Sequence, residues 1–153
     1  MPDAIRHLLA NLRERDRDEL SEYGFTPDVI EGAIRAPHIA FNMLEHQGKP
    51  AACIWFDAIT PKTLVASMLA TDDWKHVARH AYCWALKVCK PRLLKAGFVR
   101  AECRVMTGHA DAIRFLDHLG FTMEARCPQF GASGKAFELW AWRLNDHVHD
   151  QDV

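Results

Sequence analysis

The sequence lacks the features of several protein classes. Its apolar runs all fall short of the roughly 18–20 residues that span a membrane, so we expect no membrane partner. Neither sign of charge dominates, with 19 Lys and Arg against 20 Asp and Glu, which argues against a dedicated nucleic-acid-binding protein. We also expect no secretory signal peptide, because no basic segment leads into an apolar one in Met-Pro-Asp-Ala-Ile-Arg-His at the start.

Cysteine pairs with the spacing of redox or zinc motifs are absent as well. The five cysteines are odd in number and widely spaced, and none forms Cys-x-x-Cys. This pattern favours reduced thiols in the core, in a reducing compartment, over a disulfide framework. The five are Cys53, Cys83, Cys89, Cys103 and Cys127.

The composition that remains is that of an ordinary soluble globular protein, with 49% hydrophobic and 25% charged residues. A chain of 153 residues can bury roughly two-thirds of its unfolded surface in one domain. No repeat, low-complexity stretch or linker divides it. We therefore expect one domain over residues 1–144 and a polar C-terminal tail over 145–153, which is typical of disordered termini.

The N-terminal part carries mixed signals. Residues 5–12 fit either a strand or a helix, and periodicity alone leaves both open. Residues 13–20 are dense in charges of both signs, which indicates a solvated helix face with local ion pairs. A helix start is predicted at Thr26-Pro27, a capping oxygen followed by proline, and Pro37 prevents that helix from continuing.

Strands are predicted from the middle of the chain onward, the first two joined as a hairpin by a turn at 46–50. They cover residues 38–45, 51–59, 63–69, 99–105, 122–126 and 137–142. A long helix follows the third strand, capped by Asp72 or Asp73 and ended or kinked near Lys90 by Pro91. This order predicts an α+β, three-layer fold around one mixed, mostly antiparallel sheet flanked by helices.

The segment 109–121 is the most informative. Apolar residues recur at helical spacing, and Gly120 followed by Phe121 fits a left-handed helix stop. Strand, helix, Gly-Phe and strand in this order resembles the GNAT (Gcn5-related N-acetyltransferase) superfamily, whose usual pattern is Asn-x-x-Ala-x-x-x-Tyr-x-x-x-Gly-Phe. This chain keeps Ala112, Gly120 and Phe121, but has His109 for the Asn and Leu116 for the Tyr.

The resemblance implies a coenzyme A site that this chain has altered. In the family, a loop of the type Arg/Gln-x-x-Gly-x-Gly/Ala opens the long helix, and its N–H groups hold the pyrophosphate. Residues 71–79 contain no glycine, and we expect Asp72 and Asp73 to compete with a phosphate for the same N–H groups. If acetyl-CoA binds nevertheless, the candidate contacts are Leu69, Thr71, Lys75, His76, Val77 and Arg79.

No catalytic residue is predicted. The resemblance places the family's proton-donating tyrosine at Leu116, and leucine cannot donate a proton. Tyr23 and Tyr82 lie outside the motif, and no spacing singles out Glu45, Glu102 or a histidine as a general base.

Other candidate sites are weaker. His76, His80 and Cys83 share a helix face at spacing that permits metal ligation, but without a marked fourth ligand we predict no metal site, there or at His147-Val-His149. The stretch 131–135 reads as a hairpin loop. Alternation places Trp140 and Trp142 on one strand face, which would form an interface if nothing inside the protein covers it.

Over nearly its whole length the chain is similar to small GNAT-like proteins of tailed bacteriophages, including internal virion and virion-assembly components. This resemblance implies a non-catalytic protein with no cofactor, whose partners are phage structural proteins and whose location is the virion or the host cytoplasm. One alternative is an acetyl-CoA-dependent N-acetyltransferase acting on a small-molecule or protein amine. Another is a sensor that binds a small ligand between splayed strands, which requires a mostly apolar pocket of at least ~300 Å³.

Overall fold

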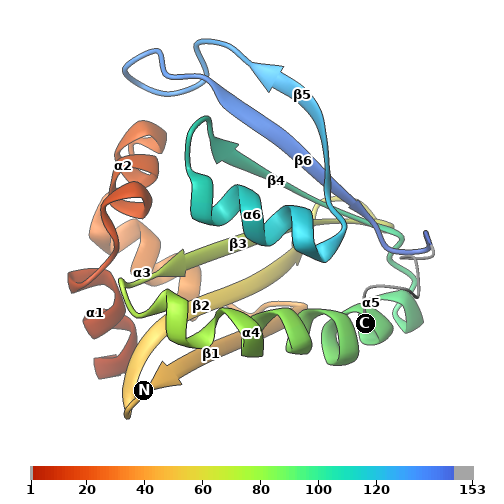
Figure 1. Cartoon of the computed structure of the whole chain (residues 1–153), viewed down its shortest axis with the longest axis horizontal. Helices are drawn as coiled ribbons and strands as arrows, with labels where there is room; N and C mark the ends of the chain where they lie inside the picture. The colour runs from red at the N-terminus through yellow and green to blue at the C-terminus, as the bar shows by residue number, and fades with distance from the viewer. Residues whose placement is uncertain (1, 147–153) are drawn as a thin grey trace.

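A six-stranded sheet organises the computed structural model, which describes residues 2–146 (Figure 1). The strand order is β1-β2-β3-β4-β6-β5, and only β3 and β4 run parallel. The predicted mixed, mostly antiparallel sheet is therefore confirmed. The strands are β1 (Ala40–His46), β2 (Lys49–Ala58), β3 (Thr63–Ala70), β4 (Arg100–Met106), β5 (Thr122–Cys127) and β6 (Phe137–Arg143).

The predicted hairpin is present as β1 and β2. Gln47 and Gly48 both have positive φ, 51° and 75°, which suits the two-residue turn that connects twisted antiparallel strands. His46 and Lys49 close the ladder on either side of this turn. The turn thus fixes the position of His46 at the end of β1.

Three helices form the N-terminal part: α1 (Pro2–Ala10), α2 (Glu14–Tyr23) and α3 (Pro27–Arg35). The segment that periodicity left open is thus mainly helix α1, and its buried Leu8 packs with Ile34 of α3 and Trp55 of β2 in one hydrophobic cluster. The start of α3 is as predicted, since the Val29 N–H donates to the Thr26 hydroxyl oxygen at 3.3 Å. These helices cover one face of the sheet.

The other face is covered by α4 (Trp74–Trp84) and α6 (Ala110–Leu119), as Figure 1 shows. A π-helical turn, η1 (Ala85–Cys89), connects α4 to α5 (Lys90–Lys95). The predicted interruption near Lys90 is this wider turn, in which the Lys90 N–H donates to the Ala85 carbonyl. Such a turn leaves room for Pro91, which has no N–H to contribute to an α-helical ladder.

The end of α6 follows the predicted pattern. Gly120 has φ +95°, its N–H donates to the Asp117 carbonyl, and the Phe121 N–H donates to the Leu116 carbonyl. These are the two hydrogen bonds of a Schellman stop. Leu116 and Phe121 are both buried, so the stop also directs the chain from α6 into β5.

The two tryptophans of β6 do not form a surface. Trp140 and Trp142 are 9% and 1% exposed and lie in the core beneath the helices, so this face is covered inside the protein. All five cysteines are free, and Cys53 and Cys89 are buried. Within residues 2–146, no helix has both the length and the apolar character to cross a membrane. The predicted tail lies outside the described residues from position 147 on, and with it His147 and His149.

Candidate functional site

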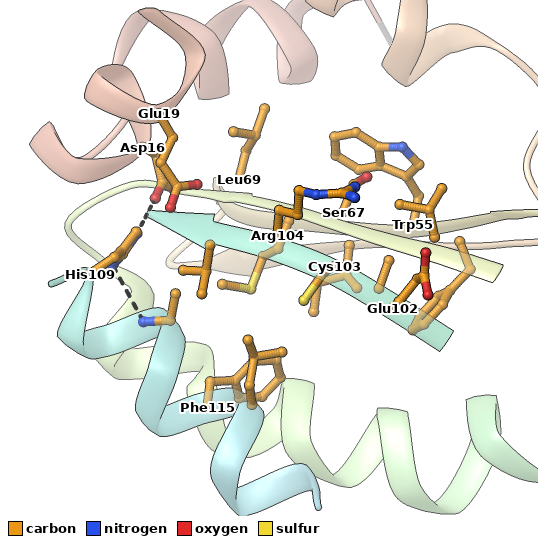
Figure 2. A pocket seen from close by; sticks show the side chains of 18 of the residues that line it. Asp16, Glu19, Trp55, Ser67, Leu69, Glu102, Cys103, Arg104, His109 and Phe115 are labelled. Atoms are coloured by element: carbon orange, nitrogen blue, oxygen red, sulfur yellow. Dashed lines mark hydrogen bonds and ion pairs between the residues drawn. The ribbon is translucent and has the colours of Figure 1, made fainter. Parts of the chain in front are cut away.

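A cavity opens where the two parallel strands separate. β3 and β4 pair only at their starts, from Thr63↔Arg100 to Val65↔Glu102, and then diverge. Residues 65–69 of β3 and 102–105 of β4 line the cavity of about 380 Å³ between them, together with α2 and α6 (Figure 2). Most of its lining is apolar, and its volume meets the size that we expect for a small-ligand site.

A buried polar cluster lies at one end of this cavity. It consists of Arg13, Asp16 and His109, which are 6%, 2% and 1% exposed. His109 Nε2 lies 2.7 Å from Asp16 Oδ1, and Arg13 Nε lies 3.1 Å from Asp16 Oδ2 as an ion pair. The expectation that residues 13–20 form a solvated helix face is therefore wrong at Arg13 and Asp16. The partner that buries them, His109, is distant in the sequence.

The cluster also supplies hydrogen-bond partners to the backbone at the end of β3. The Ala70 N–H donates to Asp16 Oδ2 at 2.7 Å, and the Ala70 carbonyl accepts from the Arg13 N–H at 2.9 Å. These two groups face the gap, because the neighbouring Thr71 N–H is directed the opposite way, to Ala51 of β2. The start of α2 therefore occupies the edge that β4 leaves when it diverges.

His109 has two structural roles. It is the N-cap of α6, where its Nδ1 accepts from the Ala112 N–H at 3.4 Å. Because Nδ1 is an acceptor there, the geometry assigns the ring proton to Nε2, which donates it to Asp16 (Figure 2). A histidine at this position thus performs the capping that an asparagine would perform, and it also reaches α2.

Glu19 is the acid that the sequence did not single out. Burial raises its pKa from 4.5 to about 7, and the negative charge of Asp16 adds to this, although the hydrogen bond from the Met106 N–H lowers it. Its carboxyl group lies in the cavity wall beside Asp16 (Figure 2). A carboxyl group that titrates near neutral pH can accept and release a proton there. In the sequence, the only indication that Glu19 lies beside Asp16 is their i, i+3 spacing on one helix.

The bases considered from the sequence are less suited. Glu102 lines the cavity, but its Oε2 lies 2.9 Å from the Arg100 guanidinium. Glu45 is exposed on β1 and does not line the cavity. Tyr23 lines the cavity, yet burial raises its pKa to about 12, and Leu116 contributes an apolar part of the wall. Tyr82 lies elsewhere, in the second pocket described next.

A second, more open pocket of about 740 Å³ lies between the start of α4 and α6. It has mixed charge, with more cationic than anionic side chains in its lining. The cationic ones are Arg13, Arg15, Lys75, Arg79 and Arg114, and the anionic ones are Glu14, Asp72 and Asp111. This lining favours an anionic ligand, although less strongly than cations alone would.

The candidate coenzyme A contacts are only partly brought together. Thr71, Lys75 and Arg79 line the second pocket, whereas Leu69 lines the cavity between the strands. Val77 is buried in the core at 2% exposure, and His76 is exposed beside β1.

The expected capping of α4 by aspartate side chains is wrong for Asp73. This residue is the N-cap, but within the described chain its carboxylate makes no hydrogen bond to the helix end. Its φ and ψ of −79° and 2° differ from the extended backbone that a capping side chain needs. Its own N–H donates to the Thr71 hydroxyl oxygen at 3.2 Å. The carboxylate of Asp73 therefore does not compete with a ligand for these N–H groups.

The buried cluster separates the two spaces. Arg13, His109 and Phe115 line both the cavity and the second pocket, so they form the wall between them. A ligand that extends from one space into the other must displace these side chains.

Comparison with known proteins identifies the fold. Neither a protein-family model nor a curated protein matches the sequence. Solved structures do match over most of their length. Ard1 from Thermoplasma volcanium is 16% identical with a TM-score of 0.72, and the alignment covers 95% of each chain.

The ribosomal-protein-S18-alanine N-acetyltransferase from Escherichia coli is 14% identical, with a TM-score of 0.68 over 97% of this chain and 91% of that one. The aminoglycoside 6'-N-acetyltransferase from Enterococcus faecium is 11% identical, with a TM-score of 0.65 over 97% and 94%. The chain has the GNAT fold. At these identities the likeness concerns the fold alone, and any activity of this chain depends on its own side chains.

Proposed function

We propose that this protein is a GNAT-fold protein that does not transfer acetyl groups and that acts through contacts with other protein chains. Its resemblance to phage proteins supports a role in a bacteriophage particle or in particle assembly. The observation that carries the proposal is the buried Arg13–Asp16–His109 cluster between the two pockets. The phage setting rests on the sequence resemblance alone.

The cluster opposes acetyl transfer because acetyl-CoA is one continuous molecule. Its anionic nucleotide would need the second pocket, where cationic side chains outnumber anionic ones, while its thioester reached the cavity between β3 and β4. The wall between these spaces consists of Arg13 and His109, which are 6% and 1% exposed, and of the half-buried Phe115. Breaking a buried ion pair by removing one partner costs about 3–5 kcal/mol, and a ligand that displaces the pair must offset a comparable energy.

An exposed aromatic patch supports a function in protein contacts. Tyr23, Phe25 and Phe130 are 37%, 44% and 39% exposed, and Tyr23 contacts the other two rings. The loop that carries Phe130 is fixed to α2, since the Ala132 N–H donates to the Glu22 carbonyl at 2.9 Å. Aromatic side chains are enriched at protein interfaces, and a fixed patch loses little entropy on binding.

Thermal unfolding with acetyl-CoA tests the non-catalytic proposal. We expect no change in Tm at millimolar acetyl-CoA, with 3'-phosphoadenosine 5'-diphosphate, the nucleotide part of CoA, as a second probe of the nucleotide pocket alone. A ligand at 100 times its Kd would stabilise the protein by about 2.7 kcal/mol. A saturable increase in Tm that Lys75→Ala and Arg79→Ala abolish, together with release of free CoA from acetyl-CoA and an amine, would overturn the proposal.

Co-purification tests the protein-contact part. We expect mass spectrometry of purified phage particles, or of assembly intermediates, to find this chain at a fixed copy number. The double variant Tyr23→Ser/Phe25→Ser should be depleted from them, while an exposed change on α4, Lys75→Ser, should not. Equal incorporation of both variants would remove the aromatic patch from the proposal, and absence from all particles would contradict the phage role.

A second candidate is an acetyl-CoA-dependent N-acetyltransferase acting on a small-molecule or protein amine. Two observations favour it: the excess of cationic over anionic side chains in the second pocket at the start of α4, and Glu19 with a pKa of about 7 in the cavity. Glu19 would accept the proton that the amine loses on acetylation. For this function we expect Glu19→Gln to lose turnover while it retains acetyl-CoA binding.

A further inference from the structure

Three metal-ligating side chains converge where the end of β1 passes the start of α4. His46 is the last residue of β1, Asp73 is the N-cap of α4, and His76 lies in the first turn of that helix. One ligand atom from each lies within 4.8 Å of the others. This cluster lies outside the linings of the cavity and of the second pocket.

We propose that His46, Asp73 and His76 bind a divalent transition metal, with Zn²⁺ as the best fit. Two imidazole nitrogens and one carboxylate oxygen form a ligand set typical of zinc, with water in the fourth position. At Zn–N and Zn–O distances of about 2.0–2.2 Å, tetrahedral ligand atoms lie about 3.3 Å apart. The side chains therefore need to approach one another by at most about 1.5 Å, which rotamer changes can supply.

The side chains are available for this role. The Asp73 carboxylate does not cap α4 in the described chain, and one of its oxygens lies in the cluster. The rings of His46 and His76 stack with centroids 4.1 Å apart and planes 9° from parallel. Histidine binds a metal ion through an unprotonated ring nitrogen.

Binding requires one ring to leave the stack, because an imidazole nitrogen coordinates a metal in the plane of its ring. His76 is exposed and can rotate, whereas His46 is half-buried beside the hairpin turn. The positive end of the α4 dipole opposes a cation, and the nearby Asp73 carboxylate offsets it. A bound ion would tie the β1–β2 hairpin to α4 and so raise Tm.

A metal ion could instead bind to histidines of α4 alone, and the experiment must distinguish that arrangement from the proposed site. His76 and His80 are one turn apart on α4, a spacing at which two histidines can share a metal without β1. Among residues 2–146, however, His80 and Cys83 do not join His76 in a cluster of three ligands. His46 is therefore the residue that distinguishes the proposed site from a site on the helix alone.

The test uses the full chain and Zn²⁺ alone, titrated by calorimetry, with Co²⁺ absorption to report the coordination geometry. All measurements use the background variant His147→Asn/His149→Asn, so that the tail histidines do not contribute to the measured number of bound zinc ions. We expect one equivalent of Zn²⁺, an increase in Tm, and tenfold or greater weakening in both His46→Ala and Asp73→Asn. His80→Ala, an exposed residue on the same helix, is the matched control and should bind as before.

Two results would overturn the inference. One is Zn²⁺ binding that His80→Ala removes and His46→Ala leaves unchanged, which would place the ion on the helix alone. The other is no saturable binding of Zn²⁺ or Co²⁺ by the chain that carries all three ligands. Tm in the absence of metal, measured for each variant, separates a lost ligand from a lost fold.

Discussion

Replacing Glu19 by glutamine should stabilise the protein at alkaline pH and have little effect at acidic pH. Burial raises the pKa of Glu19 from 4.5 to about 7, so the folded state binds this proton more tightly than the unfolded state. Stability from this group is therefore complete below about pH 4.5 and is lost as the pH rises to about 7. Glutamine has no proton to lose and keeps an oxygen that can accept from the Met106 N–H.

The magnitude follows from the difference in pKa. Each pKa unit corresponds to about 1.4 kcal/mol, so a rise from 4.5 to about 7 sets an upper bound of about 3.4 kcal/mol. Glu19 keeps partial contact with solvent in the cavity wall, and we therefore expect a gain of about 2 kcal/mol at pH 8 and less than about 1 kcal/mol at pH 5.

Urea unfolding of both proteins at several pH values between 5 and 8 measures this gain. Glu22→Gln is the control on the same helix, because hydrogen bonds from Ser133 lower the pKa of Glu22, and the sign of its effect should be opposite. A gain for Glu19→Gln that is equal at pH 5 and pH 8 would show that folding does not raise the pKa of Glu19, and a loss that grows with pH would show that the folded protein favours the ionised carboxylate. Either result would refute the reasoning.

Three further changes test other parts of the structure. His109→Ala should lower the free energy of unfolding by about 2–4 kcal/mol in urea, because it removes a hydrogen-bond donor to the buried Asp16 carboxylate (about 1–3 kcal/mol) and the cap of α6 (about 1 kcal/mol), while the ion pair with Arg13 remains; a loss below about 1 kcal/mol would contradict the buried hydrogen bond. Gly120→Ala should cost about 1–2 kcal/mol, since φ is +95° there, and an unchanged urea midpoint would argue against the left-handed stop. Leu116→Tyr should lower the free energy of unfolding by less than about 1.5 kcal/mol, because the new ring can enter the cavity. It should not release CoA from acetyl-CoA, and such activity would show that the cluster does not block transfer.

Features that depend on neighbouring residues could be predicted from the sequence. The Thr26 cap, the hairpin turn before Lys49 and the stop at Gly120 each rest on the conformational preference of one or two residues. Their hydrogen bonds span only a few positions along the chain. The layered fold then follows, because the alternation of strands and helices leaves few ways to bury the apolar faces.

The polar sites could not be predicted in the same way. Asp16 pairs with a residue 93 positions away, and in its own segment it looks like one more charge on a solvated helix. His46 and His76 stack although they lie on different elements, a contact that spacing along one helix, which groups His76 with His80, does not indicate. Asp73 was expected to cap α4 because of its residue type, but its backbone angles prevent this. Each error concerns a side chain whose role is set by tertiary contacts.

The divergence of β3 and β4 explains why the protein needs the buried cluster at all. Strands that separate leave N–H and C=O groups without a neighbour, and a buried group left unpaired costs about 1–3 kcal/mol. At Ala70 these groups must bond to water, to a ligand or to the chain itself, and here they bond to Asp16 and Arg13. Arg13 and Asp16 are buried there as an ion pair, and His109 adds a hydrogen bond to Asp16 while it caps α6. The same contacts that supply partners to the splayed sheet therefore also form part of the wall between the cavity and the second pocket.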